Sequence, residues 1–427
     1  MAQVPIGPVA TFFLCIIFAK FVHAWRSRST VFVHGRTCRN SISHGGKMPL
    51  YELAVFGAPT AEQLKKLQEQ LADACDRFKL KLGEEISLVV QPAEFRPGTR
   101  AAAAAIFFGG KDSVEIDISK SMDCESISIL PVASNDASVA TEIPASLRRL
   151  NCLFVDKVSP ERIFNALLEC VGLLPRQRRV FLSYRRNEAT AAAVQLFSEL
   201  SARQFDVFLD TQGIGPAVDF QETLWHQLCD VDVLIMLETP KYFESRWTSA
   251  EYGRALAKGI GVLRVQWPDT TPSIHTGTAS LVELVKDELD ELGQLGLPAV
   301  ERICSQLENV RSLSHATRHL SMVTAVQDAI EQVEGKIDCV GSNRSMYLTL
   351  RSGRKLVIQP TIGVPTSLLL QETFERAAGE ESAVVYDHFG LKRSWQVHMD
   401  WLAQKVPGTR WVKKTEAVWD FGGWEAM

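Results

Sequence analysis

Short apolar runs alternate with amphipathic stretches throughout Arg178–Pro268, and this alternation limits the folds open to the chain. The runs are Val180–Tyr184, Phe205–Leu209, Asp232–Leu237 and Gly261–Val265. Repeated units of a short apolar run and a helix-period segment predict a parallel sheet that is buried on both faces. Ligands of such sheets bind in the crevice at the carboxyl ends of the strands.

Four motifs in this region occur in a recognisable order. They are FLSYRR in the first run, FDVFLDT in the second, the loop QGIGPAVDF that follows it, and SRWTSAE at a helix start. Together they resemble a bacterial TIR (Toll/interleukin-1 receptor) domain. The resemblance implies a flavodoxin-like, doubly wound parallel sheet.

Trp247 and Glu251 are four residues apart in a segment of helical period, so both side chains lie on one face. An acid beside a large aromatic ring suits a cationic ring and its sugar, as in NAD⁺. Nicotinamide leaves NAD⁺ as a neutral group, so a single carboxylate that stabilises the oxocarbenium-like transition state can suffice. A packed ring and a solvated acid at the same spacing is the structural alternative.

The resemblance implies roles for individual residues. It makes Glu251 the catalytic glutamate, and Arg185 suits a phosphate because of its planar guanidinium. Trp247 suits packing against the sheet equally well. The residues implied to line the substrate pocket are Ser183, Tyr184, Arg185, Asp210 and Trp247. NAD⁺ is then a substrate, and we predict neither a cofactor nor a metal.

The resemblance further implies an NAD⁺ glycohydrolase that releases nicotinamide and ADP-ribose or a cyclic form. Such an enzyme would be a regulated effector of bacterial anti-phage defence or signalling, located in the cytoplasm, with self-association through the TIR domain and an unknown sensor or partner protein. The alternative is an adaptor without catalysis that acts through protein–protein interaction. Ala217 follows Pro216 where the family commonly has glycine. Either Gly213 and Gly215 supply the flexibility instead, or loop-mediated assembly or pocket closure is in doubt.

The length of 427 residues exceeds one ordinary core and predicts several domains. We expect an N-terminal α/β domain over 48–175, either receiver-like or degenerate TIR-like, a TIR domain with C-terminal helices over 178–335, and a small C-terminal α/β domain over 345–427. Outside the four apolar runs, we also expect helices over Val139–Leu150, Leu281–Leu295, Ala299–Val310 and Leu313–Val333.

Composition excludes some classes of function. A net charge of −4 provides no general attraction for nucleic acid or anionic membranes. The nine cysteines contain no C-x-x-C pair, so neither a disulfide framework nor a zinc knuckle is indicated. This usage is typical of a reducing cytosol.

Residues 1–47 allow two interpretations. The apolar run Val9–Trp25 is slightly short of the roughly 20 residues that a membrane span needs, and the basic residues Arg26–Arg28 follow it. As an anchor it would leave the remaining chain in the cytoplasm. Alternatively, Gly45-Gly46-Lys47 is encoded by purine-rich codons that can hold a ribosome-binding sequence before Met48, which would make 1–47 a mis-assigned extension.

Three weaker motifs have ordinary explanations. His315 and His319 lie one helical turn apart, but packing or solvation is favoured over a metal site because further ligands are missing. The helix start at Thr366-Ser367 suits either a phosphate or a simple helix cap. Gly109-Gly110-Lys111-Asp112 lacks the remaining residues of a phosphate-binding loop and indicates a turn.

Overall fold

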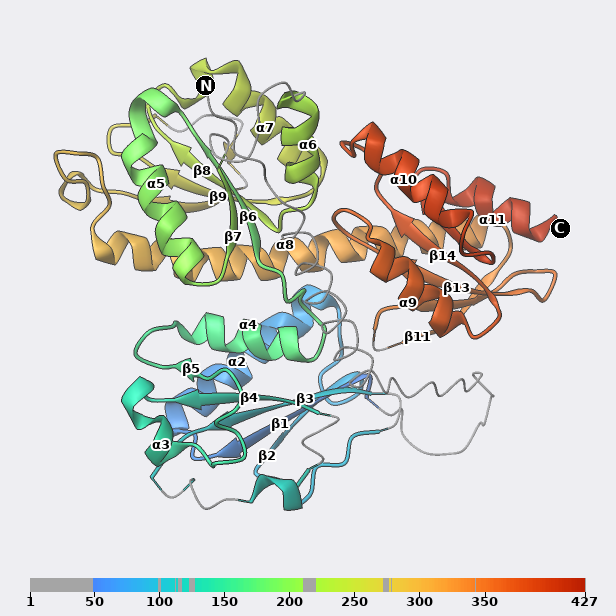
Figure 1. The fold of residues 1–427 in the computed structure, drawn as a ribbon, viewed down its shortest axis with the longest axis horizontal. Helices are drawn as coiled ribbons and strands as arrows, with labels where there is room; N and C mark the ends of the chain where they lie inside the picture. Colours follow the sequence, from blue (N-terminus) through green and yellow to red (C-terminus); the bar gives the residue numbers. More distant parts are fainter. Residues whose placement is uncertain are drawn as a thin grey trace, which may run out of the picture. The chain divides into compact units, whose positions relative to one another are not determined.

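A computed structural model describes residues 49–98, 101–111, 113, 117–122, 127–209, 220–271, 276–277, 279–341 and 343–426. Residues 1–47, Asp112, Asp210 and the loop with Pro216 and Ala217 lie outside these ranges, so the expectations placed on them remain untested. The described residues form three five-stranded sheets with their covering helices (Figure 1). Among the described helices, none combines the length and apolarity needed to cross a bilayer.

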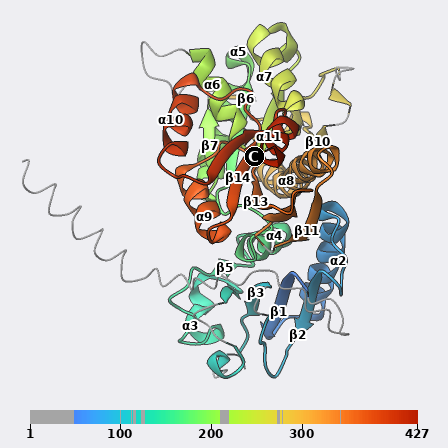
Figure 2. The same ribbon diagram turned by 90° about the vertical axis from the view of Figure 1, so that its right-hand side faces the viewer.

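The first sheet is entirely parallel and has the strand order β2-β1-β3-β4-β5. Its strands are β1 (Tyr51–Gly57), β2 (Ile86–Val90), β3 (Ala102–Phe108), β4 (Ser128–Ala133) and β5 (Leu153–Phe154). Its helices are α2 (Ala61–Phe78), α3 (Val139–Glu142) and α4 (Pro160–Cys170), with one-turn helices at Ile118–Lys120 and Asp136–Ser138. Figure 2 shows α2 and α4 on one side of this sheet and α3 on the other. Both faces are therefore buried, as in other parallel sheets.

Local signals place two of these helices. Thr60 and Gln63 form a capping box at the start of α2, with each side chain accepting from the other residue's backbone N–H. Ser159 caps α4, and Pro160 occupies its first turn. The predicted helix over Val139–Leu150 is wrong beyond Glu142. Pro144 disfavours helical backbone at Ile143, which is extended and ends α3.

The second sheet is also entirely parallel, in the order β10-β9-β8-β6-β7. Its strands are β6 (Arg179–Tyr184), β7 (Asp206–Leu209), β8 (Val233–Glu238), β9 (Gly261–Gln266) and β10 (Ser280–Glu283). Its helices are α5 (Arg186–Ala202), α6 (Phe220–Cys229), α7 (Arg246–Ala257) and α8 (Leu297–Gln332), with one-turn helices η3 (Tyr242–Glu244) and η5 (Lys286–Glu288). Numbered along the chain, the order is 2-1-3-4-5, which is the flavodoxin-like order. The first sheet has the same order, so the flavodoxin-like topology occurs twice in this chain.

Two helix predictions after β9 are wrong. The start of the predicted helix over 281–295 is the strand β10, in which Leu281 is exposed while Val282 is buried against β9. The helices predicted over 299–310 and 313–333 are one helix, α8, of 36 residues. Arg311 and Ser312, which resemble a polar break in the sequence, are buried inside it.

Helix α8 contributes to three apolar cores. Ile303 and Leu307 pack with the second sheet, Ala316 packs with the first, and Val326 and Ile330 pack with the third. The N-terminal half of α8 is therefore part of the core of the second sheet, and its C-terminal half is part of the core of the third.

The third sheet is mixed and has the order β11-β12-β13-β14-β15. Its strands are β11 (Lys336–Val340), β12 (Met346–Thr349), β13 (Lys355–Pro360), β14 (Glu381–Tyr386) and β15 (Thr409–Lys413), and its helices are α9 (Ser367–Ala377), α10 (Arg393–Ala403) and α11 (Ala417–Glu425). The first three strands are antiparallel and the last three are parallel. β12 and β13 form a hairpin, and β11 precedes them in the sheet, from Lys336 to Val340.

Candidate active site

Ser183 lies at the carboxyl end of β6, the strand at which the strand order of the second sheet reverses. Successive side chains of a strand point to opposite faces. Tyr184 accordingly packs into the core on the α5 side. Ser183 is 1% exposed and its hydroxyl contacts residues of η3 and α7. The strand therefore separates two residues that the sequence predicted to share a pocket.

Glu251 projects from α7 toward the end of β6. The Ser183 hydroxyl donates a hydrogen bond of 2.5 Å to the Glu251 Oε2 atom. The Ser183 Oγ also lies 2.6 Å from the Tyr242 hydroxyl oxygen. Because Ser183 has a single proton and gives it to Glu251, Tyr242 is the donor in the second bond. A linear relay from Tyr242 through Ser183 to the carboxylate results.

The relay is almost fully buried, with Glu251 4% and Tyr242 0% exposed. Burial, and next the neighbouring charge of Glu251, hold the pKa of the Tyr242 hydroxyl well above its ordinary value. Tyr242 therefore stays protonated at physiological pH and remains a hydrogen-bond donor. The Glu251 carboxylate therefore has hydrogen-bonding partners and little contact with solvent.

Side-chain to backbone contacts fix α7 to the η3 turn that carries Tyr242. The Thr248 hydroxyl donates to the Tyr242 carbonyl oxygen at 2.5 Å. The Ser249 hydroxyl donates to the carbonyl oxygens of Phe243 at 3.2 Å and Ser245 at 3.0 Å. These bonds satisfy carbonyl groups just before the helix and hold Tyr242 and Glu251 in one rigid unit.

A buried ion pair that sequence analysis missed lies on the neighbouring strands. Glu238 ends β8 and accepts bonds from Arg264 Nε at 2.9 Å and Nη2 at 2.6 Å. Arg264 also donates to the Thr276 carbonyl oxygen at 3.2 Å. Both charged residues are at most 5% exposed. The available sequence signal was the arginine inside the apolar run Gly261–Val265, where an unpaired charge would be very unfavourable.

The other predicted pocket residues are dispersed. Arg185 precedes α5 and pairs with Glu188 at 3.3 Å and Glu244 at 3.2 Å. Trp247 is half-buried on α7, and the Arg246 guanidinium stacks 4.6 Å from its ring centre. Of the predicted set, the structure thus joins Ser183 with Glu251 and places Tyr184 elsewhere, while Asp210 lies outside the described residues.

His315 and His319 lie one turn apart on α8, and both are half-buried. The Arg344 Nη1 atom lies 2.9 Å from His315 Nε2. Burial, and next the positive charge of Arg344, keep the pKa values of both His315 and His319 low, with that of His319 at about 3. Within the described ranges, no three histidine, cysteine or acidic side chains gather as metal ligands would.

The second sheet and this site define an α/β domain of flavodoxin-like topology with a carboxylate at the carboxyl end of its strands. Residues 180–295 match the family model described as the TIR domain. The chain therefore contains a TIR domain over these residues. No curated protein matches it.

Proposed function

We propose that this protein is an NAD⁺ glycohydrolase in which Glu251 is the catalytic residue. The observation that supports the proposal is the 2.5 Å hydrogen bond by which Ser183 orients the Glu251 carboxylate at the strand ends of the TIR domain. A carboxylate held in one orientation is preorganised to stabilise positive charge.

The reaction breaks the bond between the nicotinamide nitrogen and the ribose. The bonding electron pair leaves with nicotinamide, which becomes neutral, and the ribose develops oxocarbenium character. Glu251 would stabilise that charge, and Ser183 and Tyr242 would act as positioning residues for it. Water completes hydrolysis to ADP-ribose, or a nucleophile within the nucleotide gives a cyclic product.

The burial of Glu251 supports a regulated enzyme. A carboxylate that is 4% exposed must gain access to the ribose before it can act. Constitutive hydrolysis would empty the cell of a central cofactor, so a resting form with a covered carboxylate suits an effector that is activated on demand. We propose that self-association through the TIR domain provides this activation, in a cytoplasmic protein of bacterial anti-phage defence or signalling.

The same burial favours a second candidate function. A glutamate satisfied by Ser183 and shielded from solvent can serve as a structural group in an adaptor that acts through protein–protein interaction. The adaptor would associate through its TIR domain and recruit a sensor or partner without chemistry.

Incubation of the full chain with NAD⁺, with and without induced oligomerisation, tests the two proposals. We expect nicotinamide, followed by chromatography, to accumulate with the assembled wild type and to be lost in Glu251→Gln. Glu291→Gln is the matched control, because Glu291 is exposed on the same domain. Nicotinamide release by Glu251→Gln at the wild-type rate would refute the assigned catalytic residue, and inactivity of the assembled wild type would favour the adaptor.

A further inference from the structure

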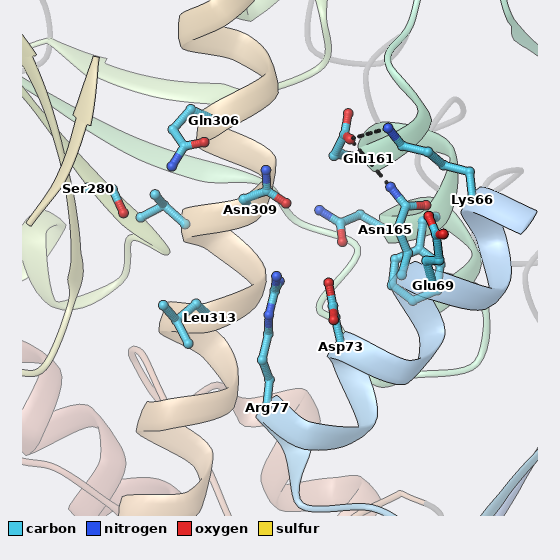
Figure 3. A pocket seen from close by; sticks show the side chains of 13 residues that line it. Lys66, Glu69, Asp73, Arg77, Glu161, Asn165, Ser280, Gln306, Asn309 and Leu313 are labelled. Atoms are coloured by element: carbon cyan, nitrogen blue, oxygen red, sulfur yellow. Dashed lines mark hydrogen bonds and ion pairs between the residues drawn. The ribbon is translucent and has the colours of Figure 1, made fainter. Parts of the chain in front are cut away.

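A polar cavity of about 480 Å³ is lined by residues that do not belong to the Glu251 site. Its walls come from α2 and α4 of the first sheet, from α8, and from Ser280 at the start of β10 (Figure 3). Its volume is within the range of roughly 300–1,000 Å³ that is typical of small-molecule sites. A ligand bound here would touch the N-terminal domain and the TIR domain at once.

The polar groups at the middle of this cavity have unused hydrogen-bonding capacity. Among the described residues, the side chains of Arg77, Asp73, Gln306 and Asn309 have no hydrogen-bond or ion-pair partner. Figure 3 shows Arg77 and Asp73 rising side by side from α2 and Asn309 facing them from α8. Arg77, Gln306 and Asn309 are half-buried, whereas Asp73 is exposed. Unused groups from two domains that face one space indicate a ligand.

The rim of the cavity is different, because its charges are paired. Glu161 lies 3.8 Å from Lys66 Nζ and accepts hydrogen bonds from Gln70 at 3.5 Å and Ser305 at 3.2 Å. Glu69 pairs with Lys65 at 3.8 Å. The charges left for a ligand are one cation, Arg77, and one anion, Asp73.

The balance of charge excludes polyanions. Two cations, Lys66 and Arg77, and three acids, Glu69, Asp73 and Glu161, line the cavity, so its formal charge is 2 − 3 = −1. A nucleoside triphosphate would be repelled. A ligand with one negative and one positive group matches the two unpaired charges.

We propose that this cavity binds a small zwitterion with a carboxylate and an ammonium group, namely an α-amino acid with a polar side chain. The Arg77 guanidinium is suited to two parallel hydrogen bonds with the carboxylate. The Asp73 carboxylate accepts from the ammonium group. The amides of Gln306 and Asn309 can donate to and accept from the polar side chain.

The proposed ligand would couple the two domains. It would add contacts between α2, on which Arg77 and Asp73 lie, and α8, on which Gln306 and Asn309 lie. One existing contact already joins the N-terminal domain to α8, because the Asn165 amide on α4 donates to the Glu308 carbonyl and carboxylate oxygens, each at 2.9 Å. Ligand binding would therefore favour the arrangement in which the N-terminal domain and α8 are in contact.

Calorimetric titration of the full chain with individual protein amino acids tests the proposal and does not depend on NAD⁺ cleavage. For an amino acid that binds, the matching amine without the carboxylate and the N-acetyl derivative are titrated next. We expect each derivative to bind at least about tenfold more weakly, because each lacks one charge-assisted bond.

Two variants assign the charged groups. Arg77→Gln should weaken the amino acid about tenfold and leave the affinity of the amine unchanged, while Asp73→Asn should weaken the amino acid and leave the N-acetyl derivative unchanged. Arg149→Gln and Asp76→Asn are matched controls at exposed positions of the same domain outside the cavity. The proposal is overturned if no amino acid binds, or if binding is the same in the wild type, Arg77→Gln and Asp73→Asn.

Discussion

Ser183 and Glu251 are 68 residues apart in the chain, and the hydroxyl of the first donates a 2.5 Å hydrogen bond to the carboxylate of the second. The contact joins the end of β6 to α7 at the edge of the sheet where ligands of this topology bind. It makes the orientation of the carboxylate dependent on one hydroxyl.

Ser183→Ala should lower kcat for NAD⁺ cleavage by about ten- to a hundredfold with little change in KM. The hydrogen bond to a charged group that it removes is worth roughly 1.5–3 kcal/mol. Steady-state kinetics of nicotinamide release measures the effect. Ser198→Ala is a suitable control, because the Ser198 hydroxyl bonds only its own helix, at the Val194 carbonyl oxygen. A higher kcat in Ser183→Ala would show that Ser183 restrains the carboxylate instead of positioning it.

Arg311→Met should destabilise the fold by about 3–5 kcal/mol, because it removes the cation paired with the buried Asp232 carboxylate, while Glu169 keeps Arg162 and Arg178 beside it. The fully buried Arg311 guanidinium donates to Glu169 at 2.7 Å and to Asp232 at 2.8 Å. Urea-induced unfolding followed by circular dichroism measures the loss. Arg302→Met breaks a pair between the exposed Arg302 and the half-buried Glu288 and should cost less, about 1 kcal/mol. Equal stabilities of the two variants would contradict a structural role for the buried pairs.

Stability should fall as pH decreases below about 6.5, the pKa of histidine in an unfolded chain. Burial lowers the folded-state pKa values of His315 and His319, and that of His319 is about 3. The folded protein therefore binds fewer protons than the unfolded chain between these pH values. The free energy of unfolding is therefore highest above pH 6.5. As the pH falls below this value, it decreases by up to about 1.4 kcal/mol per pH unit for each histidine.

Urea unfolding at a series of pH values tests this dependence. The neighbouring groups whose charges lower the pKa of His315 are Arg344, His319, Arg318 and Arg311, in decreasing order of effect. His319→Gln should flatten the dependence between pH 6.5 and 4 while stability at pH 8 changes little. An unaltered slope in this variant would assign the acid sensitivity to other groups.

Gly261→Ala should destabilise the protein by about 1–3 kcal/mol through overpacking. A Cβ atom at Gly261 would lie 2.8 Å from Ser314 Cβ and 3.0 Å from Val310 Cγ1 on α8. Gly253→Ala is the opposite case, since no atom lies within 4 Å of its added Cβ in the interior of α7. Alanine there should be neutral or stabilise by up to about 1 kcal/mol. Thermal unfolding of both variants compares them, and a stable Gly261→Ala protein would show that α8 can move away from β9.

The strands of the TIR domain could be predicted because each one is a short apolar run bounded by polar residues. The helix caps at Thr60 and Ser159 could also be predicted, because capping depends only on residues one turn apart. Helix α8 could not be predicted as one element. Arg311 resembles a break when its neighbours in sequence are considered alone, and it is buried because Glu169 and Asp232 compensate its charge.

The sequence by itself determined the order of strands and helices from β6 to β9, the TIR domain, and Glu251 as the residue on which the proposed chemistry depends. Periodicity and motifs are local properties, so they can be recognised in the amino-acid sequence alone. Only the tertiary structure decided that Ser183 and Tyr242 hold Glu251 while Tyr184 faces the opposite side of the sheet. It also placed Arg77 opposite Asn309. These relationships depend on which face of each element is buried and on contacts between residues distant in sequence, which local patterns do not specify.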